Sequence, residues 1–203
     1  MAIAYAGLRV ELREVVLKNK PQAMLCISPK GTVPVLHLSC GNVIDESREI
    51  MQWAMARTQE GIPPLIESDR MGELVEAIDH QFKPQLDRYK YADRYPESSA
   101  ESYRDNALSL LTPLAKRLKQ NAYLFDSKPS FADIATFPFV RQFAHVDKAW
   151  FEQAAPAALQ HWLDRWLSDP LFLQCMDKYP QWQPQNAAVY FPEEATFSGT
   201  HKP

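Results

Sequence analysis

The chain has 203 residues, of which 46% are apolar and 23% are charged, and its formal net charge is −3. This length allows one domain or two small ones with a buried core, and the composition is typical of a globular protein. The slightly acidic balance and the lack of basic clusters give no support for a nucleic-acid partner, and no apolar run approaches the length of a membrane span. We therefore expect neither nucleic acid nor a membrane as a partner.

The first part of the chain has a pattern typical of strands and short helices. Residues 9–16 alternate enough for a strand, and 22–27 form a short irregular or helical link. A hairpin follows, with one strand after Pro34, Gly41-Asn42 as its turn and Val43-Ile44 as its return strand. Asp45-Glu46-Ser47 is typical of a helix start, and the apolar spacing predicts a helix from Glu46 to Arg57.

After residue 60 the pattern becomes almost wholly helical. Gly61-Ile62-Pro63-Pro64 interrupts it, as a linker between domains does. Apolar residues spaced three and four apart predict a long helix over 71–89 with a kink at Pro84, and a second over 103–118 with strain at Pro113. Ser130-Phe131-Ala132-Asp133 has the spacing of a capping box and predicts a third helix, and Pro156 opens a fourth.

These patterns together predict an α+β protein with two domains. We expect an α/β domain over residues 1–60, a linker over 61–68 and an all-α helical bundle over 69–203 that ends in an irregular, proline-containing tail.

The hairpin and the following helix start have a chemistry of their own. If the Val33–Pro34 bond is cis, the backbone N–H and C=O of Val33 are free to pair with an extended peptide. Backbone N–H groups at the helix start and the Ser47 hydroxyl suit a carboxylate, and Glu46 can accept from an amino group. A short peptide with a free α-amino and α-carboxyl group, such as glutathione, has this shape. Both features are also common for purely structural reasons.

Four motifs carry a resemblance to a known family. LKNKP at 17–21, SPKGTVPVL at 28–36 and DES at 45–47 resemble the first domain of cytosolic glutathione transferases, and the omega-like branch is the nearest. SFADIATFPFVRQF at 130–143 resembles the capped helix of the family's second domain. The resemblance implies a thioredoxin-like first domain followed by an all-helical domain.

The resemblance also implies roles for individual residues. Lys20 would approach the glycyl carboxylate of glutathione, Val33 beside Pro34 would pair with the cysteinyl backbone, and Glu46 and Ser47 would hold the γ-glutamyl end. For Lys20, a solvated charge after a strand is the alternative.

One part of the family pattern has no counterpart in this sequence. The family's first strand and the loop with the thiol-activating Ser, Cys or Tyr precede the segment that MAIAYAG resembles, so we expect the catalytic residue upstream of Met1. Residues 9–16 and 35–38 would then lose a shared neighbouring strand, and residues 3–6 alone are too short to hold a helix. Our hypothesis is an N-terminally truncated chain that reflects a late start; the alternative is a natural short form without catalysis.

The other reactive side chains offer no replacement. Cys26, Cys40 and Cys175 form no C-x-x-C pair, which favours a reducing compartment, and with no signal peptide evident we expect a cytoplasmic protein. His37 and Cys40 lack the other ligands of a zinc site, so no metal is expected. The aromatic residues of the helical domain are expected either to line a site for an apolar substrate or to fill the core (Phe82, Tyr89, Tyr91, Tyr95 and Tyr103).

Two functions follow from the resemblance. The first is an enzyme, a homodimeric glutathione transferase or thiol transferase that activates the thiol of glutathione, its substrate, toward a small electrophile or a disulfide. The alternative is a non-catalytic module that binds glutathione or a protein.

Overall fold

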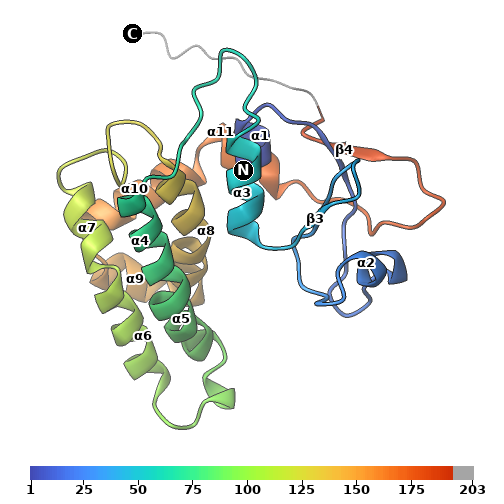
Figure 1. The fold of residues 1–203 in the computed structure, drawn as a ribbon. Coiled ribbons are helices and arrows are strands. Elements are labelled where there is room, and N and C mark those ends of the chain that lie inside the picture. The colour runs from blue at the N-terminus through green and yellow to red at the C-terminus, as the bar shows by residue number, and fades with distance from the viewer. Residues whose placement is uncertain (194–203) are drawn as a thin grey trace. The chain divides into compact units, whose positions relative to one another are not determined.

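The computed structural model describes residues 1–193, and these form two compact units. The first unit contains Met1–Pro64 and the segment from Pro170 onward, and the second contains Leu65–Asp169. The predicted α+β architecture with a thioredoxin-like α/β part and a helical part is confirmed (Figure 1).

Within residues 1–193, the first unit contains four short strands and several short helices. Along Met1–Pro64 the elements are α1 (Ala2–Tyr5), β1 (Val10–Leu12), α2 (Gln22–Ile27), β2 (Leu36–His37), β3 (Val43–Ile44) and α3 (Ser47–Met55). From Pro170 they are α11 (Pro170–Leu173), a 3₁₀ turn η3 (Gln174–Met176) and β4 (Val189–Phe191).

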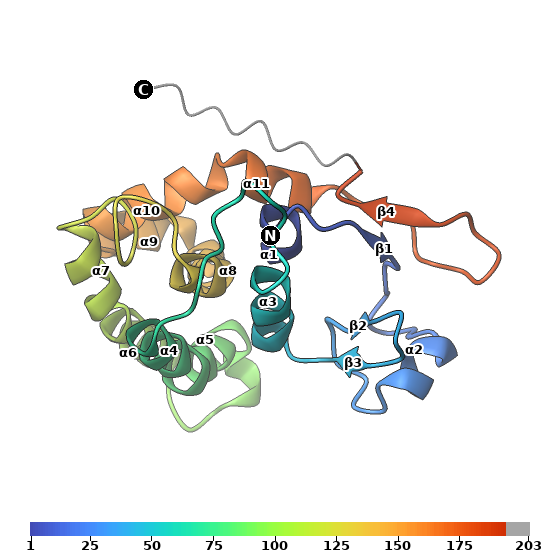
Figure 2. The same cartoon turned by 45° about the horizontal axis from the view of Figure 1, so that its top comes forward.

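The strands form two separate antiparallel pairs. The predicted hairpin is present, since Leu36 pairs with Ile44 and His37 with Val43. The other pair joins β1 to β4, with Val10 opposite Phe191 and Leu12 opposite Val189. The structure thus differs from the expected irregular tail at residues 189–191, because this segment supplies the neighbour that satisfies one edge of β1 (Figure 2). The remainder of the expected tail, residues 194–203, lies outside the described residues.

Helix α1 forms although its segment is too short for a stable isolated helix. Ala2, Ala4 and Ala6 are buried, and the helix packs against α3. The Tyr5 hydroxyl donates to the Pro63 carbonyl at 3.0 Å, and the Gln59 N–H donates to the Ala6 carbonyl at 2.9 Å. Gly7 ends the helix with a φ of 71°, and a Cβ there would lie 2.7 Å from Oε1 of Gln59. Tertiary contacts therefore supply what the local sequence lacks.

The second unit is a bundle of helices. Its elements are α4 (Asp69–Ala77), a π-helical turn η1 (Ile78–Phe82), α5 (Lys83–Lys90), a 3₁₀ turn η2 (Ala92–Arg94), α6 (Ala100–Leu110), α7 (Thr112–Leu118), α8 (Phe131–Val146), α9 (Lys148–Ala154) and α10 (Ala157–Leu167). Both predicted proline irregularities appear. The π turn ends at Phe82, two residues before Pro84, and α6 ends before Pro113, which lies in the first turn of α7.

The core of this unit is aromatic. Phe82, Phe137, Phe143, Trp162 and Trp166 are fully buried, and edge-to-face contacts join several of their rings. Among the described residues, no helix is long and apolar enough to cross a membrane.

Candidate functional site

The turn after α2 positions one charged side chain. Ser28-Pro29-Lys30-Gly31 has the residues that a type I turn favours at its first, second and fourth positions, and the Gly31 N–H donates to the Ser28 carbonyl at 2.9 Å. Gly31 adopts a φ of 63°, a backbone conformation that costs glycine little. The turn presents the exposed Lys30 side chain while Ser28 stays buried.

The hairpin delivers three further side chains to the start of α3. Asp45 follows β3 directly, Glu46 is the N-cap residue of α3, and Ser47 is the first residue of the helix. Glu46 is extended, with φ −111° and ψ 129°, and its side chain makes no capping hydrogen bond. The Ser47 hydroxyl is exposed and, within residues 1–193, makes no hydrogen bond. This helix start is therefore not closed by its own side chains.

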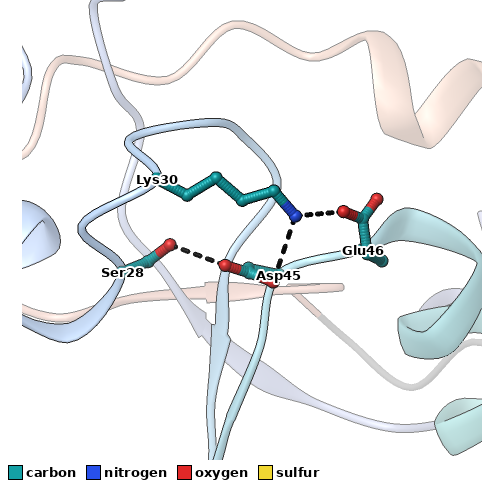
Figure 3. Close-up of polar contacts among 4 residues, drawn as sticks. All are labelled: Ser28, Lys30, Asp45 and Glu46. Carbon is teal, nitrogen blue, oxygen red and sulfur yellow. Dashed lines mark hydrogen bonds and ion pairs between the residues drawn. The ribbon is translucent and has the colours of Figure 1, made fainter.

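Four side chains form a charged cluster beside this helix start, which we call the Lys30 cluster: Ser28, Lys30, Asp45 and Glu46 (Figure 3). Nζ of Lys30 contacts Oε1 of Glu46 and lies 3.6 Å from Oδ1 of Asp45. The buried Ser28 hydroxyl donates to Oδ2 of Asp45 at 2.9 Å. The hydrogen bond to the Glu46 carboxylate raises the pKa of the Lys30 ammonium.

The Lys30–Glu46 contact is exposed to solvent. The side chain of Lys30 is 47% exposed and that of Glu46 is 57% exposed. Exposed ion pairs contribute little to stability because water competes for both charges. Glu46 is thus oriented by Lys30 but still accessible to a second cation.

The Val33–Pro34 peptide bond is cis. This is the condition on which the peptide-binding role predicted for the backbone of Val33 depends. Val33 is exposed, and among the described residues its backbone N–H and C=O make no hydrogen bond. Pro34 lies just before β2 and is exposed as well. The backbone of Val33 is therefore available to an extended ligand.

Lys20 lies on a different segment of the same unit. A tight turn joins Val16 to Asn19, and Lys20 connects this turn to Pro21, the N-cap residue of α2. Within the described part of the chain the Lys20 ammonium makes no ion pair. Glu46 and Ser47 are neighbours in the chain, and no hydrogen bond in residues 1–193 links Lys20 or Val33 to them.

Sequence reasoning missed three members of the Lys30 cluster, namely Ser28, Lys30 and Asp45. The signal was present for Lys30, because the turn preferences of Ser28-Pro29-Lys30-Gly31 indicate an exposed third position. The direction in which that side chain points depends on how the turn packs against the hairpin, which periodicity does not encode.

The other candidate groups do not gather into a site. Phe82 and Tyr103 are buried, and the Tyr103 hydroxyl donates to the Tyr95 carbonyl at 3.2 Å, so these two serve the core. Cys26 and Cys40 are exposed free cysteines on separate elements. No group of three or more potential metal ligands occurs among the described residues.

Family models match both parts of the chain. The model of the glutathione S-transferase N-terminal domain matches residues 1–61, and that of the C-terminal domain matches residues 72–165. The chain belongs to the glutathione S-transferase family. Membership supports a glutathione transferase-like function, and the family uses glutathione as its substrate.

Solved structures of glutathione transferases share the fold. Glutathione transferase Omega 3C from Trametes versicolor is 19% identical with a TM-score of 0.73, covering 89% of this chain and 83% of that chain. A glutathione S-transferase from Methylobacillus flagellatus, solved with GSH bound, is 21% identical with a TM-score of 0.69, covering 85% of this chain and 89% of that chain. BphK, a bacterial glutathione S-transferase solved as a ternary complex, is 24% identical with a TM-score of 0.69, covering 85% and 88%. No match was found among curated protein sequences.

Proposed function

We propose that this protein binds glutathione in its first unit and presents the glutathione thiol to a small electrophile or a disulfide. The observation that carries the proposal is the open start of α3. Its N-cap residue Glu46 and its first residue Ser47 are exposed, and among residues 1–193 neither the Glu46 side chain nor the Ser47 hydroxyl makes a capping hydrogen bond.

The γ-glutamyl end of glutathione fits the charges at this position. Its α-carboxylate would accept hydrogen bonds from the first backbone N–H groups of α3 and from the Ser47 hydroxyl, in a place where the helix dipole favours an anion. Its α-ammonium would donate to Glu46. The Lys30 cluster holds one cation and two carboxylates, so an ammonium from the ligand balances the remaining negative charge.

The rest of the peptide would extend away from α3. The free backbone of Val33 offers one donor and one acceptor, which matches the cysteinyl residue of an extended ligand. The Lys20 ammonium would pair with the glycyl carboxylate at the other end. These contacts would leave the thiol between the two ends of the peptide.

Two reactions are compatible with a thiol held in this way. In conjugation the thiolate sulfur forms a bond to carbon, and the leaving group departs with its electron pair. In thiol exchange the thiolate attacks one sulfur of a disulfide and forms a mixed disulfide with it, while the other sulfur leaves as a thiolate. The resemblance to the omega-like branch would favour exchange if the thiol-activating residue is Cys. A cytoplasmic homodimer completes the proposal and is supported by the family alone.

The second candidate is a glutathione- or protein-binding module without turnover. It is favoured by the roles assigned above, since Lys20, Val33, Glu46 and Ser47 hold the ligand and none of them activates the thiol. Binding and turnover must therefore be measured separately.

The first experiment is a calorimetric titration of glutathione into the protein and two variants. Glu46→Gln removes the charge that would accept the α-ammonium, so we expect Kd to rise about tenfold or more. Glu49→Gln is the matched control, because Glu49 is also an exposed acid in the first turn of α3, and it should leave Kd unchanged.

The outcomes separate the two functions. Wild-type protein that does not bind glutathione, or equal affinities for wild type and Glu46→Gln, would overturn the proposed site. If glutathione binds, conjugation of a small aryl halide or reduction of a disulfide above the uncatalysed rate supports the enzyme. Binding with neither activity supports the module.

A further inference from the structure

The segment after α11 runs along the first residues of the same unit, far from it in sequence. In Figure 2, β4 lies beside β1, and the pairing joins residues 10–12 to 189–191. The Trp182 N–H donates to the Glu14 carbonyl at 3.0 Å, and the Arg13 guanidinium lies 4.8 Å from the centre of the Trp182 ring. We call residues 177–193 the C-terminal segment.

One side chain of this segment reaches the turn next to Lys20. Nε2 of Gln181 donates to the Asn19 carbonyl at 3.2 Å, across 162 positions of sequence. The Asn19 N–H donates to the Val16 carbonyl at 2.8 Å, which is the backbone hydrogen bond of the turn. Asn19 is therefore held on both sides, by the turn itself through its N–H and by Gln181 through its C=O.

Lys20 is confined between this held residue and a proline. Pro21 has a φ of −61°, and a residue before proline is restricted to extended conformations. The direction in which Lys20 leaves the turn is then set mainly by the peptide plane between Asn19 and Lys20. Gln181 bonds the carbonyl of that plane.

We infer that Gln181 is a positioning residue for Lys20 and thereby tunes recognition of the glycyl carboxylate of glutathione. The inference rests on the proposed function, which pairs Lys20 with that carboxylate. Gln181 touches no ligand in this scheme. The Gln181 hydrogen bond restricts the orientation of the peptide plane before Lys20 in the free protein. The Lys20 side chain therefore loses less conformational entropy when it binds the ligand.

A purely structural role for the same contact predicts a different result. If Gln181 only helps β4 and Trp182 cover the edge of β1, its loss would lower stability or weaken all ligands equally. A role through Lys20 affects only ligands that carry the glycyl carboxylate. The discriminating quantity is therefore the ratio of two affinities, for glutathione and for its glycyl amide, in which a neutral amide replaces this carboxylate.

The experiment titrates both ligands into the wild-type protein, three single variants and the Gln181→Met/Lys20→Met double variant. Gln181→Met removes the donor at similar length, Lys20→Met removes the ammonium, and Gln183→Met is the control, because Gln183 is an exposed glutamine two positions along the same segment. We expect Gln181→Met to reduce the preference for glutathione over its amide by about threefold to tenfold, with the affinity for the amide unchanged. Lys20→Met should reduce the same preference at least as far, the double variant no further than Lys20→Met, and Gln183→Met should behave as wild type.

Two results would overturn the inference while leaving the proposed function intact. One is a Gln181→Met variant that keeps the full wild-type preference while Lys20→Met loses it. The other is a Gln181→Met variant that weakens both ligands equally. Failure of wild type to bind either ligand would instead overturn the proposed function, and this inference with it.

Discussion

The first backbone N–H groups of α3 and of α8 have no acceptor within their own helix. The two helices differ in what lies at these groups. Both helices follow an extended residue, Glu46 before α3 and Ser130 before α8, and both have a carboxylate close by. At α8, Ser130 and Asp133 form a capping box. At α3 the N-cap side chain makes no such bond and instead contacts Lys30.

Burial explains the difference. Asp133 is fully buried, and its carboxylate accepts from the N–H and hydroxyl of Ser130, from the N–H of Leu124 at 3.0 Å and from Nε1 of Trp162 at 2.7 Å. Donors that water cannot reach must find partners inside the protein. At α3 water or a ligand can satisfy the same groups, so an open helix start persists only where it is exposed.

The closed helix start also has an electrostatic cost. Burial raises the pKa of the Asp133 carboxyl, and the hydrogen bonds from Ser130, Leu124 and Trp162 oppose that rise. A carboxyl with this many donors serves as a structural junction between α8, α10 and the preceding loop. We therefore expect the start of α8 to contribute to stability and the start of α3 to ligand binding, and mutations at each start test these two roles.

The largest effect is expected at the closed start. Asp133→Ala would leave the N–H groups of Leu124, Ser130 and Trp162 without their partner in a buried place, so we expect the free energy of unfolding to fall by about 3–5 kcal/mol. Urea denaturation measures the change.

Asp147→Ala is the matched control for that variant. Asp147 is also a helix-capping aspartate, which accepts from the Trp150 N–H at 3.0 Å, but it is exposed. Its loss should cost about 0.5–2 kcal/mol. Equal losses for the two variants would show that burial does not distinguish the closed helix start.

The next largest effect is expected from replacing the serine at each helix start, because one serine should matter for stability and the other for glutathione affinity. Ser130→Ala should lower the free energy of unfolding by about 1–2 kcal/mol and leave glutathione affinity unchanged, because it breaks the capping box. Ser47→Ala should change stability by less than about 0.5 kcal/mol and raise Kd for glutathione about threefold to tenfold, because its hydroxyl is left for the ligand.

Denaturation and calorimetry on the same two proteins give the comparison directly. A Ser47→Ala variant that loses stability and keeps full affinity would contradict the view that α3 starts open for a ligand.

The elements predicted from sequence are those specified by neighbouring residues. The capping box of Ser130 and Asp133 needs only a spacing of three, and the hairpin needs only Gly41-Asn42 between two apolar pairs. The helix start at Glu46 and Ser47 was likewise predicted within one residue. Local rules determine each of these features, so each can be predicted from a single sequence.

The features not predicted depend on contacts between distant residues. The strand at 189–191 exists because β1 is beside it, and α1 is helical because α3 and Gln59 support it. Lys30 meets Glu46 because the turn at Ser28–Gly31 packs beside the hairpin. The five expected ligand-binding residues remain predictions, since a fold shared at low identity does not test them.

Lys30 offers the smallest and most specific test of the open helix start. Without its ammonium the adjacent carboxylates of Asp45 and Glu46 repel each other, and the site becomes more negative toward a ligand with two carboxylates and one ammonium. We expect Lys30→Met to raise Kd for glutathione about twofold to fivefold, with a smaller effect at high salt because exposed charges are screened. Lys18→Met removes an exposed lysine from the turn before Lys20 and controls for the change in net charge. Tighter binding by Lys30→Met would mean that Lys30 competes with the ligand ammonium for Glu46 and does not orient Glu46 for the ligand. Equal weakening by Lys30→Met and Lys18→Met would mean that Lys30 acts only through its long-range charge.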